Sequence, residues 1–518
     1  MKNKINVIRI ISTFIILIII GLLMEAVMEL FNEPTAVWVH IKENLLFGYT
    51  MNTILLVSLS MLFSGVIGTV MAYFVTCYDF YGRKILSILL YFPLAIPPYI
   101  GAYVYVDMFQ KGGLIANIIK TTIPIHSLWM SVFVFTLFLY PYVYIGVRGY
   151  LSNNMAGYIE NARLLKKSEF EIFLKVILPI SKYAIFSGMV FVGLEVLGDF
   201  GVVQYLGVQT FATAIFKSWI NFKDFDSAIR LSGVLVLVVL FLLVVKYKLV
   251  NKKQPSATTT KTRALQRHKL SKLSQVGMAG VGFSILLLSF ALPIYQLIQW
   301  ALMSYSRVRY VNLVDMLKNT LFISIGIALL IVILATIISS YTRVSSKSIK
   351  LVYGKMSILP YAIPGSVMAM MFIVFFKKLD DFFMLSIGTT IFMLLTAYVI
   401  RYLGIAYENL ENGYKKIGIR YHEASRTLGE GYYRTLFKVD IPILKPFLFS
   451  AFSLVFLDLI KELPLTLVLR PFNFNTLSTQ VYQYASDEMV EESAVPSIII
   501  IALSMIIVYG LVKKKRRR

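Results

Sequence analysis

Long apolar runs separated by short polar segments make up most of the chain. Stretches such as FIILIIIGLLMEAV at 14–27 and LSGVLVLVVLFLLVV at 231–245 carry almost no charge. About 20 consecutive apolar residues in a helix cross the roughly 30 Å hydrocarbon core of a bilayer. The pattern therefore predicts an all-α, polytopic membrane protein. Twelve spans are expected, at 7–27, 52–77, 85–108, 128–149, 183–203, 228–250, 276–303, 319–341, 351–376, 382–402, 445–465 and 496–512.

The first apolar run and the prolines refine this picture. The first run resembles a secretory signal, yet it is longer than a usual signal core and no small-residue cleavage pattern follows it. An uncleaved first membrane helix is therefore expected. Some other spans contain prolines, among them the span with prolines at 93, 97 and 98 and the span with prolines at 360 and 364. Because proline lacks an N–H group and its ring clashes with the preceding turn, kinks are expected there.

The composition agrees with a membrane protein. The 518 residues are 58% hydrophobic and only 15% charged, and the mean hydropathy is +0.74. The net charge of +24 would suit nucleic-acid binding in a soluble protein, but here Lys and Arg gather in alternate loops and in the tail KKKRRR. Membrane proteins keep such residues in the cytoplasm. Both termini are therefore expected in the cytoplasm, with no nucleic-acid partner. The single cysteine, Cys77, excludes an intramolecular disulfide.

The chain contains an internal duplication. Four segments recur at a spacing of 263 to 267 residues: 52–54 with 319–321, 92–97 with 359–364, 158–179 with 421–442, and 210–213 with 476–479. The repeated unit has about six helices, and six is even, so the two copies are expected to run parallel around an axis along the membrane normal. The predicted domains are a first half at 1–250, a linker at 251–274 and a second half at 275–518. The polar, basic linker suits a solvated cytoplasmic connector, and contact with anionic lipid is the alternative.

Each half carries one polar insert, read as YIENARLLKKSEFEIFLKVILP at 158–179 (hook one) and YHEASRTLGEGYYRTLFKVDIP at 421–442 (hook two). In hook two, Glu423-Ala424-Ser425 suits the start of a short helix, and Gly429 permits a sharp turn. Pro442 is expected to begin the next membrane helix. Two similar hooks on the cytoplasmic face, one in each half, suit the docking of two copies of one partner.

Hook two resembles the signature of ABC importer permeases: Glu-Ala-small, three residues, Gly, nine residues, aliphatic-x-aliphatic-Pro. Glu423, Ala424, Ser425, Gly429 and Pro442 supply its elements. Hook one has Glu160-Asn161-Ala162 and Pro179, with Asn161 in place of Ala and Lys166 in place of Gly. The resemblance implies that each hook is a coupling helix that sits in a cleft of a separate ATPase subunit, present in two copies. An ordinary amphipathic loop is the alternative.

The chain has no G-x-x-x-x-G-K-[ST] phosphate loop. ATP-Mg is therefore expected on the partner ATPase, with no cofactor in this chain, which is not itself expected to be an enzyme. The segments 197–219 and 461–488 resemble the fused, two-half permeases of ferric-iron importers. That resemblance implies an extracytoplasmic binding protein and the cytoplasmic (inner) membrane of a bacterium. Related permeases carry thiamine, phosphonates, sulfate or polyamines. An ion-driven secondary transporter is the alternative of another class.

Acidic side chains suggest a route for the cargo. Glu195 and Asp199 lie four residues apart on the expected fifth helix, and Asp458 and Glu462 occupy the matching positions of the second half. Intramembrane carboxylates usually face a cavity or a partner, and oxygen ligands suit a hard cation such as Fe³⁺. The alternative is structural pairing, for example with Lys461 or Arg470.

Tyrosines and histidines are further candidates for binding cargo. Tyr99, Tyr103 and Tyr105 are candidate oxygen ligands, or residues of an interfacial aromatic belt. The histidines at 40, 126, 268 and 422 show no metal-site spacing. His422 is expected on the docking surface of hook two.

Overall fold

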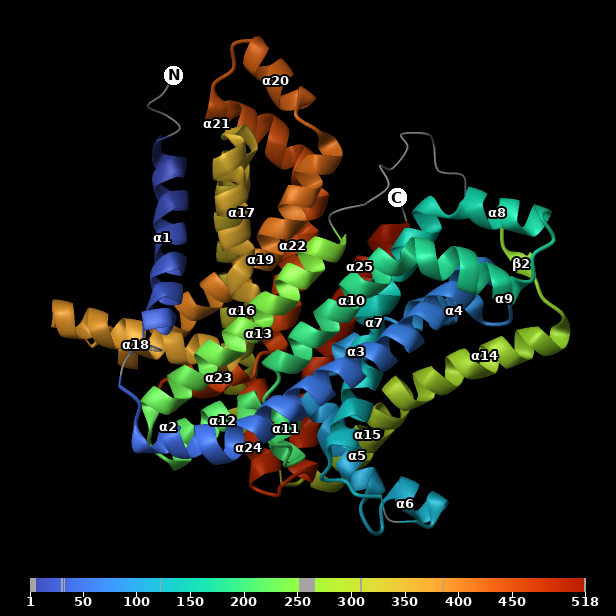
Figure 1. Cartoon of the computed structure of the whole chain (residues 1–518), viewed down its shortest axis with the longest axis horizontal. Coiled ribbons are helices and arrows are strands. Elements are labelled where there is room, and N and C mark those ends of the chain that lie inside the picture. Colours follow the sequence, from blue (N-terminus) through green and yellow to red (C-terminus); the bar gives the residue numbers. More distant parts are fainter. Residues whose placement is uncertain are drawn as a thin grey trace. The chain divides into compact units, whose positions relative to one another are not determined.

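The computed structural model describes residues 6–28, 31, 33–121, 123–250, 266–307, 310–384 and 386–516. These residues are almost entirely helical, which confirms the all-α prediction (Figure 1). Ten helices within them are long and apolar enough to cross a membrane, or up to twelve if each of two bent pairs forms one span. The strands β1 (Tyr78–Asp79) and β2 (His268–Lys269) have two residues each and pair in parallel.

The described residues form two compact units, and each unit takes segments from both halves of the sequence. Unit 1 comprises Met1–Val39, Ile215–Val236 and Arg309–Tyr482, and unit 2 comprises His40–Ala214, Leu237–Val308 and Gln483–Arg518. The boundaries predicted for the two halves and the linker remain predictions, and most of the linker, 251–265, lies outside the described residues.

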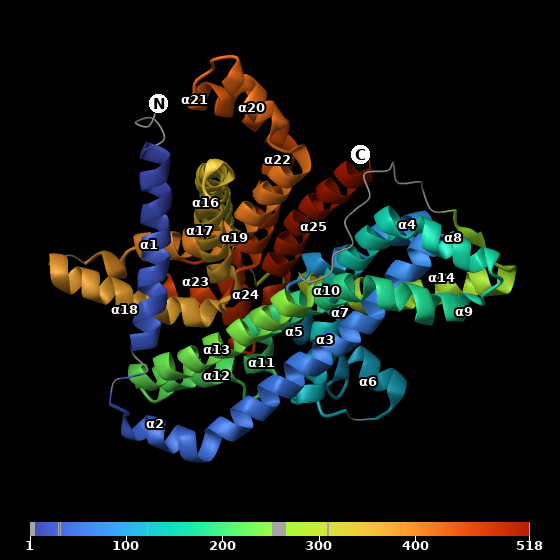
Figure 2. The same ribbon diagram turned by 45° about the horizontal axis from the view of Figure 1, so that its top comes forward.

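Unit 1 contains α1 (Asn6–Met28), η6 (Lys217–Asn221), α16 (Tyr310–Val344), α17 (Lys347–Ala362), α18 (Gly365–Phe383), η8 (Ile387–Thr389), α19 (Ile391–Ile417), α20 (Arg420–Thr427), α21 (Tyr432–Thr435), η9 (Leu436–Asp440), α22 (Ile441–Lys461) and α23 (Pro464–Leu469). The N-terminal helix α1 packs on α16, α17 and α18 of the second half (Figure 1, Figure 2). A hydrogen bond of 2.8 Å between the Thr13 and Tyr353 hydroxyls joins α1 to α17.

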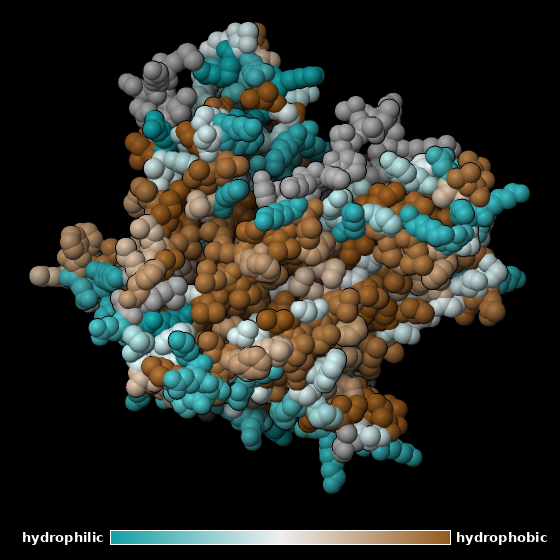
Figure 3. Space-filling model, viewed as in Figure 1, coloured by the Kyte–Doolittle hydropathy of each residue, from teal (hydrophilic) through white to brown (hydrophobic). Residues whose placement is uncertain are grey.

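Unit 2 contains η3 (Ile41–Leu45), α3 (Leu46–Cys77), α4 (Arg83–Leu89), η4 (Phe92–Ala95), α5 (Pro98–Phe109), α6 (Leu114–Ile119), α7 (Leu128–Asn154), α8 (Ala156–Leu164), α9 (Glu169–Ile172), η5 (Phe173–Ile177), α10 (Leu178–Gly198), α11 (Gly201–Tyr205), α14 (Lys272–Leu286), η7 (Leu287–Ala291), α15 (Leu292–Ser304), η10 (Glu491–Ser493) and α25 (Ala494–Arg516). The second-half helices α14 and α15 pack on α4 and α5, respectively. The visible faces of α3, α10 and α14 are largely hydrophobic, as a lipid-facing surface requires (Figure 3).

Four helices contain a boundary between the units: α2 (Ala36–His40), α12 (Phe211–Phe216), α13 (Phe225–Val250) and α24 (Leu477–Ser486). They carry the chain from one unit to the other, so neither unit is a continuous stretch of sequence.

Proline breaks two of the predicted spans outright. The helices before and after Pro97 are bent by 94°, and those around Pro364 by 110°. Ile96 and Ile363, which precede these prolines, both have extended backbones, because the proline ring disfavours the helical conformation of its neighbour. The kink predictions are confirmed, and each of the spans expected at 85–108 and 351–376 corresponds to a bent pair of helices rather than to one continuous helix. The next helix, α19, also begins later than expected because α18 extends to Phe383.

Glycines let three helices of unit 2 approach closely. A Cβ atom on Gly68 of α3 would lie 2.7 Å from the Val143 Cβ and 2.8 Å from the Tyr140 carbonyl oxygen, both on α7. A Cβ on Gly188 of α10 would lie 2.7 Å from the Val143 Cα. Close backbone approach at small residues is the usual source of helix association in a membrane. Val143 is therefore the point where α3, α7 and α10 meet.

Two of the repeated segments contact each other within unit 2. The Asn52 amide donates to the Gln209 carbonyl at 3.0 Å. The Thr53 hydroxyl oxygen accepts from the Phe211 N–H at 3.2 Å. The side chains of α3 thus satisfy backbone groups at the start of α12, which would otherwise lack partners.

The same pair of contacts recurs in unit 1. The Asn319 amide donates to the Asn475 carbonyl at 3.2 Å, and the Thr320 hydroxyl oxygen accepts from the Leu477 N–H at 2.9 Å. The duplicated sequence therefore builds the same local structure twice. The segments at 52–54 and 210–213, and their repeats at 319–321 and 476–479, thus form matching contacts in the two units.

Candidate functional site

Hook one is a short helix, a tight turn and a second helical piece. α8 ends in a turn in which the Leu165 N–H donates to the Asn161 carbonyl at 3.1 Å and the Lys166 N–H donates to the Arg163 carbonyl at 2.9 Å. The Lys167 N–H then donates to the Ala162 carbonyl at 3.2 Å. Lys166 has a left-handed backbone with φ of 55°, so it occupies the position where the resemblance expects glycine.

Hook two repeats this turn 263 residues later, after α20. The N–H groups of residues 428, 429 and 430 donate to the carbonyls of Ala424, Arg426 and Ser425 at 3.1, 3.1 and 3.2 Å. Gly429 has φ of +87°, and the turn predicted for it is confirmed. The left-handed conformation costs a non-glycine residue about 1–2 kcal/mol of conformational free energy. Lys166 adopts it in hook one in spite of this cost. The two hooks therefore share one backbone path despite their different turn residues.

The second piece of each hook runs directly into a membrane helix. α9 continues through the π-helical turn η5 into α10, and α21 continues through η9 into α22. Pro179 and Pro442 stand among the first two residues of α10 and α22. The expectation that Pro442 begins the next membrane helix is thus confirmed, and the π-helical turn η9 joins that helix to the hook without a break.

The two hooks expose the same kinds of side chain at matching positions. Each has a tyrosine before the turn, a leucine in the turn and a large apolar residue after it, all between 43% and 85% exposed: Tyr158, Leu165 and Leu174 in hook one, and Tyr421, Leu428 and Phe437 in hook two. Glu423 and Ala424 are also exposed, as is Asn161, while Glu160 and Ser425 are half-buried and Ala162 is buried. We call these three exposed apolar side chains of each hook its contact face.

A buried ionic cluster holds hook two to α16. The Arg343 Nη1 donates to the Asp440 Oδ1 at 2.9 Å, and His422 Nδ1 lies 2.7 Å from Oδ2 of the same carboxylate. The side chains of Arg343, Asp440 and His422 are only 8%, 4% and 7% exposed. The guanidinium also lies 4.4 Å from the centre of the Tyr414 ring and donates to the Gly418 carbonyl. His422 therefore faces inward, and its predicted place on the docking surface is wrong.

An apolar cluster supports the base of hook two. Tyr432 and Leu436 of the hook pack with Tyr341 of α16 and Ile8 of α1. The N-terminal helix, which comes from the first half of the sequence, thus contacts the hook of the second half. Nothing in the local sequence pattern indicates this contact.

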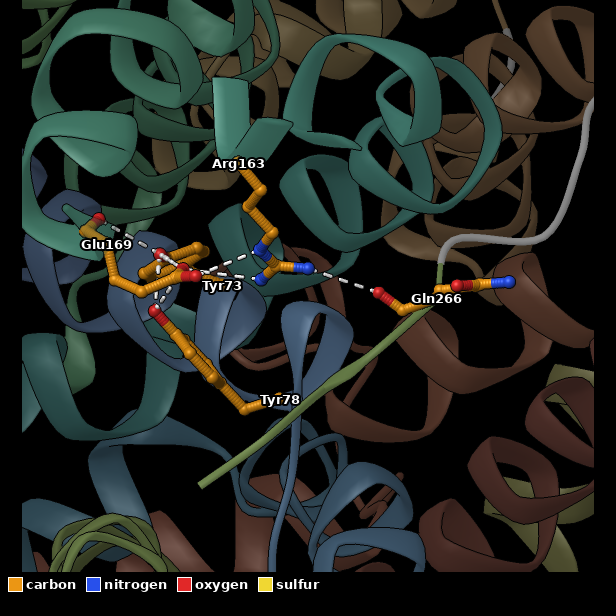
Figure 4. A network of polar contacts seen from close by, with 5 residues as sticks. All are labelled: Tyr73, Tyr78, Arg163, Glu169 and Gln266. Carbon is orange, nitrogen blue, oxygen red and sulfur yellow. Dashed lines mark hydrogen bonds and ion pairs between the residues drawn. The ribbon is translucent and has the colours of Figure 1, made fainter. Parts of the chain in front are cut away.

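A polar network joins the two pieces of hook one across its turn (Figure 4). Arg163 binds Glu169 with two hydrogen bonds, of 2.9 Å from Nε and 3.3 Å from Nη2. The Tyr78 hydroxyl donates to the Glu169 Oε2 at 2.9 Å, and the Tyr73 hydroxyl lies 2.6 Å from the Tyr78 hydroxyl. Burial raises the pKa of Tyr78 above its ordinary value, so this phenol stays protonated as the donor. Arg163 Nη1 also donates to the Gln266 carbonyl at 3.2 Å.

The predicted acidic pairs do not lie on single helix faces. α10 ends at Gly198 and α22 ends at Lys461, so Asp199 and Glu462 lie just beyond them with extended backbones. The Asp199 Oδ1 accepts from the Val202 N–H at 2.8 Å. Glu462 accepts from the N–H groups of the second and third residues of α23, both at 3.0 Å. Both carboxylates cap the short helix that follows, as acids commonly do.

The other two acids lie near the ends of their helices. The Glu195 carboxylate accepts a hydrogen bond of 3.2 Å from Tyr142. Asp458 accepts one of 3.5 Å from a tyrosine and lies 3.9 Å from the Lys461 ammonium. Arg401, which the sequence reasoning missed, lies 3.9 Å from Glu462. The alternative of structural pairing therefore has direct contacts in its favour in unit 1, with Lys461 as suggested and with Arg401 in place of Arg470.

The candidate tyrosines are buried inside unit 2. Tyr99, Tyr103 and Tyr105 of α5 are at most 3% exposed, so the interpretation as a lipid-facing belt is wrong. The Tyr103 ring lies 4.4 Å from that of Tyr205, and the Tyr105 hydroxyl donates to the Leu288 carbonyl. Across the described parts of the chain, no three His, Cys, Asp or Glu residues gather as a metal site.

These features define a multi-pass membrane permease built from two repeats, each with one hook. The chain belongs to the family described as binding-protein-dependent transport system inner membrane component, whose model matches residues 64–253 and again residues 331–518. The protein is thus a permease of ABC-type, binding-protein-dependent transport, and the double match confirms the predicted duplication. The family consists of transport permeases rather than catalytic enzymes.

Individual relatives agree on the class and differ in cargo. The chain is 26% identical over 452 residues to the Fe(3+)-transport system permease protein FbpB 2 of Haemophilus influenzae, and the match covers 86% of each chain. It is 29% identical over 156 residues to the sulfate transport system permease protein CysT of Escherichia coli, which covers 30% of this chain and 56% of that protein. CysW of the same organism is 28% identical over 141 residues.

Proposed function

We propose that this chain is the permease subunit of an ATP-driven importer of ferric iron in the inner membrane of a bacterium. Each hook docks one copy of a separate ATPase subunit, which binds ATP-Mg. A binding protein on the outer side delivers the cargo. Both termini and both hooks lie in the cytoplasm, as the distribution of Lys and Arg suggests.

The observation that carries this proposal is the matched pair of hooks. They share the turn hydrogen bonds and the three exposed apolar positions, although their buried contacts differ. Exposed apolar side chains cost free energy in water unless a partner covers them. Two matched contact faces favour two copies of one partner over two unrelated loops.

The choice of ferric iron depends on other observations. The relative that matches along most of the chain is a Fe(3+)-transport permease, and the acids Glu195, Asp199, Asp458 and Glu462 supply the hard oxygen atoms that Fe³⁺ prefers. Tyr99 and Tyr103 stay candidates for the same pathway. Sulfate is the second candidate cargo, because two of the relatives that match over shorter stretches are sulfate permeases and Arg401 places a cation beside Glu462.

Docking is tested by placing a charge on each contact face. Leu165→Glu and Leu428→Glu are expected to weaken binding of the purified ATPase subunit by about thirtyfold each, since truncating an interface hot spot costs about 2 kcal/mol. Phe472→Glu is the control, because Phe472 is 95% exposed in a loop outside both hooks. Equal loss in all three variants, or no loss in the hook variants, would contradict the proposal.

Cargo is tested in proteoliposomes that contain this chain, the ATPase and a matching binding protein. Uptake of labelled Fe³⁺ that requires internal ATP and is lost in Glu423→Arg supports both class and cargo. ATP-dependent uptake of sulfate without Fe³⁺ uptake keeps the class and excludes iron. Uptake driven by an ion gradient without ATP would favour the secondary transporter.

A further inference from the structure

A strand from the start of the second half lies against hook one. Within unit 2, β1 follows α3 directly, and β2 lies two residues before α14. Their parallel pairing puts Tyr78 opposite His268, whose ring lies 6.4 Å from the tyrosine ring at 74°. The carbonyl of Gln266, two residues before β2, accepts a hydrogen bond from Arg163. We call residues 266–269 the strap.

Arg163 connects the strap to both pieces of hook one. Arg163 lies on α8, before the turn, and Glu169 begins α9, after it. The bidentate pair between them therefore closes the hook across its turn. Tyr78, which pairs with the strap through its backbone, donates to the same Glu169 carboxylate. The strap is thus attached to the hook both directly, at Arg163, and through β1.

Hook two has no equivalent of these contacts among the described residues. The residue that matches Arg163 is Arg426, which donates to the Glu430 carbonyl inside the hook at 2.7 Å. The residue that matches Glu169 is Tyr432, which packs in the apolar cluster with Ile8. Within the part of the chain that the structure describes, the strap contacts hook one and not hook two. The two hooks have similar outer faces and different attachments.

We propose that the strap sets the position of hook one, with Arg163 and Glu169 as the positioning residues, and that it transmits movement of α14 to this hook alone. The proposal rests on the proposed function, in which the hook docks an ATPase subunit. Because only Leu270 and Ser271 separate β2 from α14, a shift of the start of α14 displaces the strap. Movement of α14 therefore displaces the ATPase copy that is docked on hook one and not the copy that is docked on hook two.

The test attaches a nitroxide spin label to the turn of either hook in the full-length chain. Leu165→Cys and Leu428→Cys are each made with Cys77→Ala, which removes the single native thiol. His268→Pro removes a backbone donor and restricts the strap, whereas His268→Ala changes the same side chain and keeps the backbone intact. Arg163→Gln and its repeat counterpart Arg426→Gln form a second matched pair. Mobility is read from the EPR line shape in nanodiscs without ATPase.

The expected result is selective. His268→Pro and Arg163→Gln increase the mobile population at position 165 by about tenfold, the effect of losing a hydrogen bond to a charged group, and leave position 428 unchanged. His268→Ala and Arg426→Gln leave position 165 unchanged. Equal mobility changes at both hooks, or no change at position 165, would refute the proposal that the strap positions hook one.

A second measurement separates this proposal from the proposed function. The ATPase subunit is added to the unaltered full-length chain, and binding is measured directly. If it binds and the EPR result is selective, the strap positions a docking element. If it does not bind, the coupling function fails, and the spin-label data still decide whether the strap holds the hook. A lower ratio of cargo transported to ATP hydrolysed in Arg163→Gln, restored in Arg163→Lys, distinguishes positioning from a loss of folding.

Discussion

The ionic cluster of hook two provides a sharp test of what holds a hook to its membrane helices. In Arg343→Met, the Asp440 carboxylate, 4% exposed, loses its guanidinium partner and keeps only His422. Removing one member of a buried ion pair usually costs about 3–5 kcal/mol. The remaining histidine compensates in part, so the lower end, about 3 kcal/mol, is expected. Since about 1.4 kcal/mol is a factor of ten, the locally unfolded population of hook two should rise roughly 100-fold.

A triple variant tests the same reasoning in the opposite direction. The positions in hook one that match His422 and Asp440 are Ile159 and Ile177, both fully buried. We therefore combine His422→Ile and Asp440→Ile with Arg343→Met, which replaces the ionic cluster by apolar side chains of similar size. Such replacements are often neutral or stabilising, so this variant should lie within about 1 kcal/mol of the unaltered chain.

Amide hydrogen exchange measured by mass spectrometry is the assay. Peptides from 420–440 report hook two, and peptides from 156–177 of the same sample provide an internal reference. Exchange should become much faster in hook two of Arg343→Met and return close to its original rate in the triple variant. If the single variant exchanges at the original rate, or the triple variant exchanges as fast as the single one, the cluster does not hold the hook.

Three further outcomes are expected. Gly68→Ala should lower the free energy of unfolding by about 1–3 kcal/mol, because the added methyl group overpacks the contact between α3 and α7. Gly48→Ala on the same helix should leave it unchanged, because no atom lies within 4 Å of the added Cβ. Equal melting temperatures for the two variants would contradict the close helix contact. Gly429→Ala should speed amide exchange in the turn of hook two by about fivefold, because alanine at this positive φ introduces about 1 kcal/mol of backbone strain. Lys166→Gly should change amide exchange in hook one little, because the strain that it relieves is offset by the larger conformational entropy of glycine in the unfolded chain. Thr53→Val should leave the first amide of α12 without its acceptor at a cost of about 1 kcal/mol, seen as faster exchange in peptides that contain that amide.

Much of the fold could be predicted because the signals are local. A membrane span needs only a long apolar run, and a break at Pro97 or Pro364 needs only the proline ring. The turn at Gly429 follows from the freedom of glycine at positive φ. The duplication helped further, because a feature predicted in one half has a counterpart at the matching position of the other half.

The acidic residues show where local reasoning failed. A spacing of four residues places Glu195 and Asp199 on one face only if the helix continues, and it ends at Gly198. A glycine just before the acid and another two residues after it were the available signal of a helix end followed by a new cap. Asp199 belongs to the next helix, and a continuous acidic face was the wrong picture.

Contacts between distant segments could not be read from the sequence at all. Arg343 and Asp440 are 97 residues apart, and Arg163 and Gln266 are 103 apart. Neither pair has a periodic pattern that would join it. The sequence also did not indicate that the two halves interleave, with α1 in unit 1 and α14 in unit 2. The apolar pattern of a membrane helix does not specify which other helices it packs against.

The contrast between the two faces of each hook bears on what the hooks are for. Inward, the copies differ: isoleucines in hook one occupy the places of a histidine and an aspartate in hook two, and Glu169 occupies that of Tyr432. Outward, tyrosine, leucine and a third large apolar residue recur at the same spacing. A loop that served only its own half would have no physical reason to keep the outer face and change the inner one. The ATPase subunit proposed above would supply that reason if it met both hooks with the same surface, because a partner constrains only the side chains it covers.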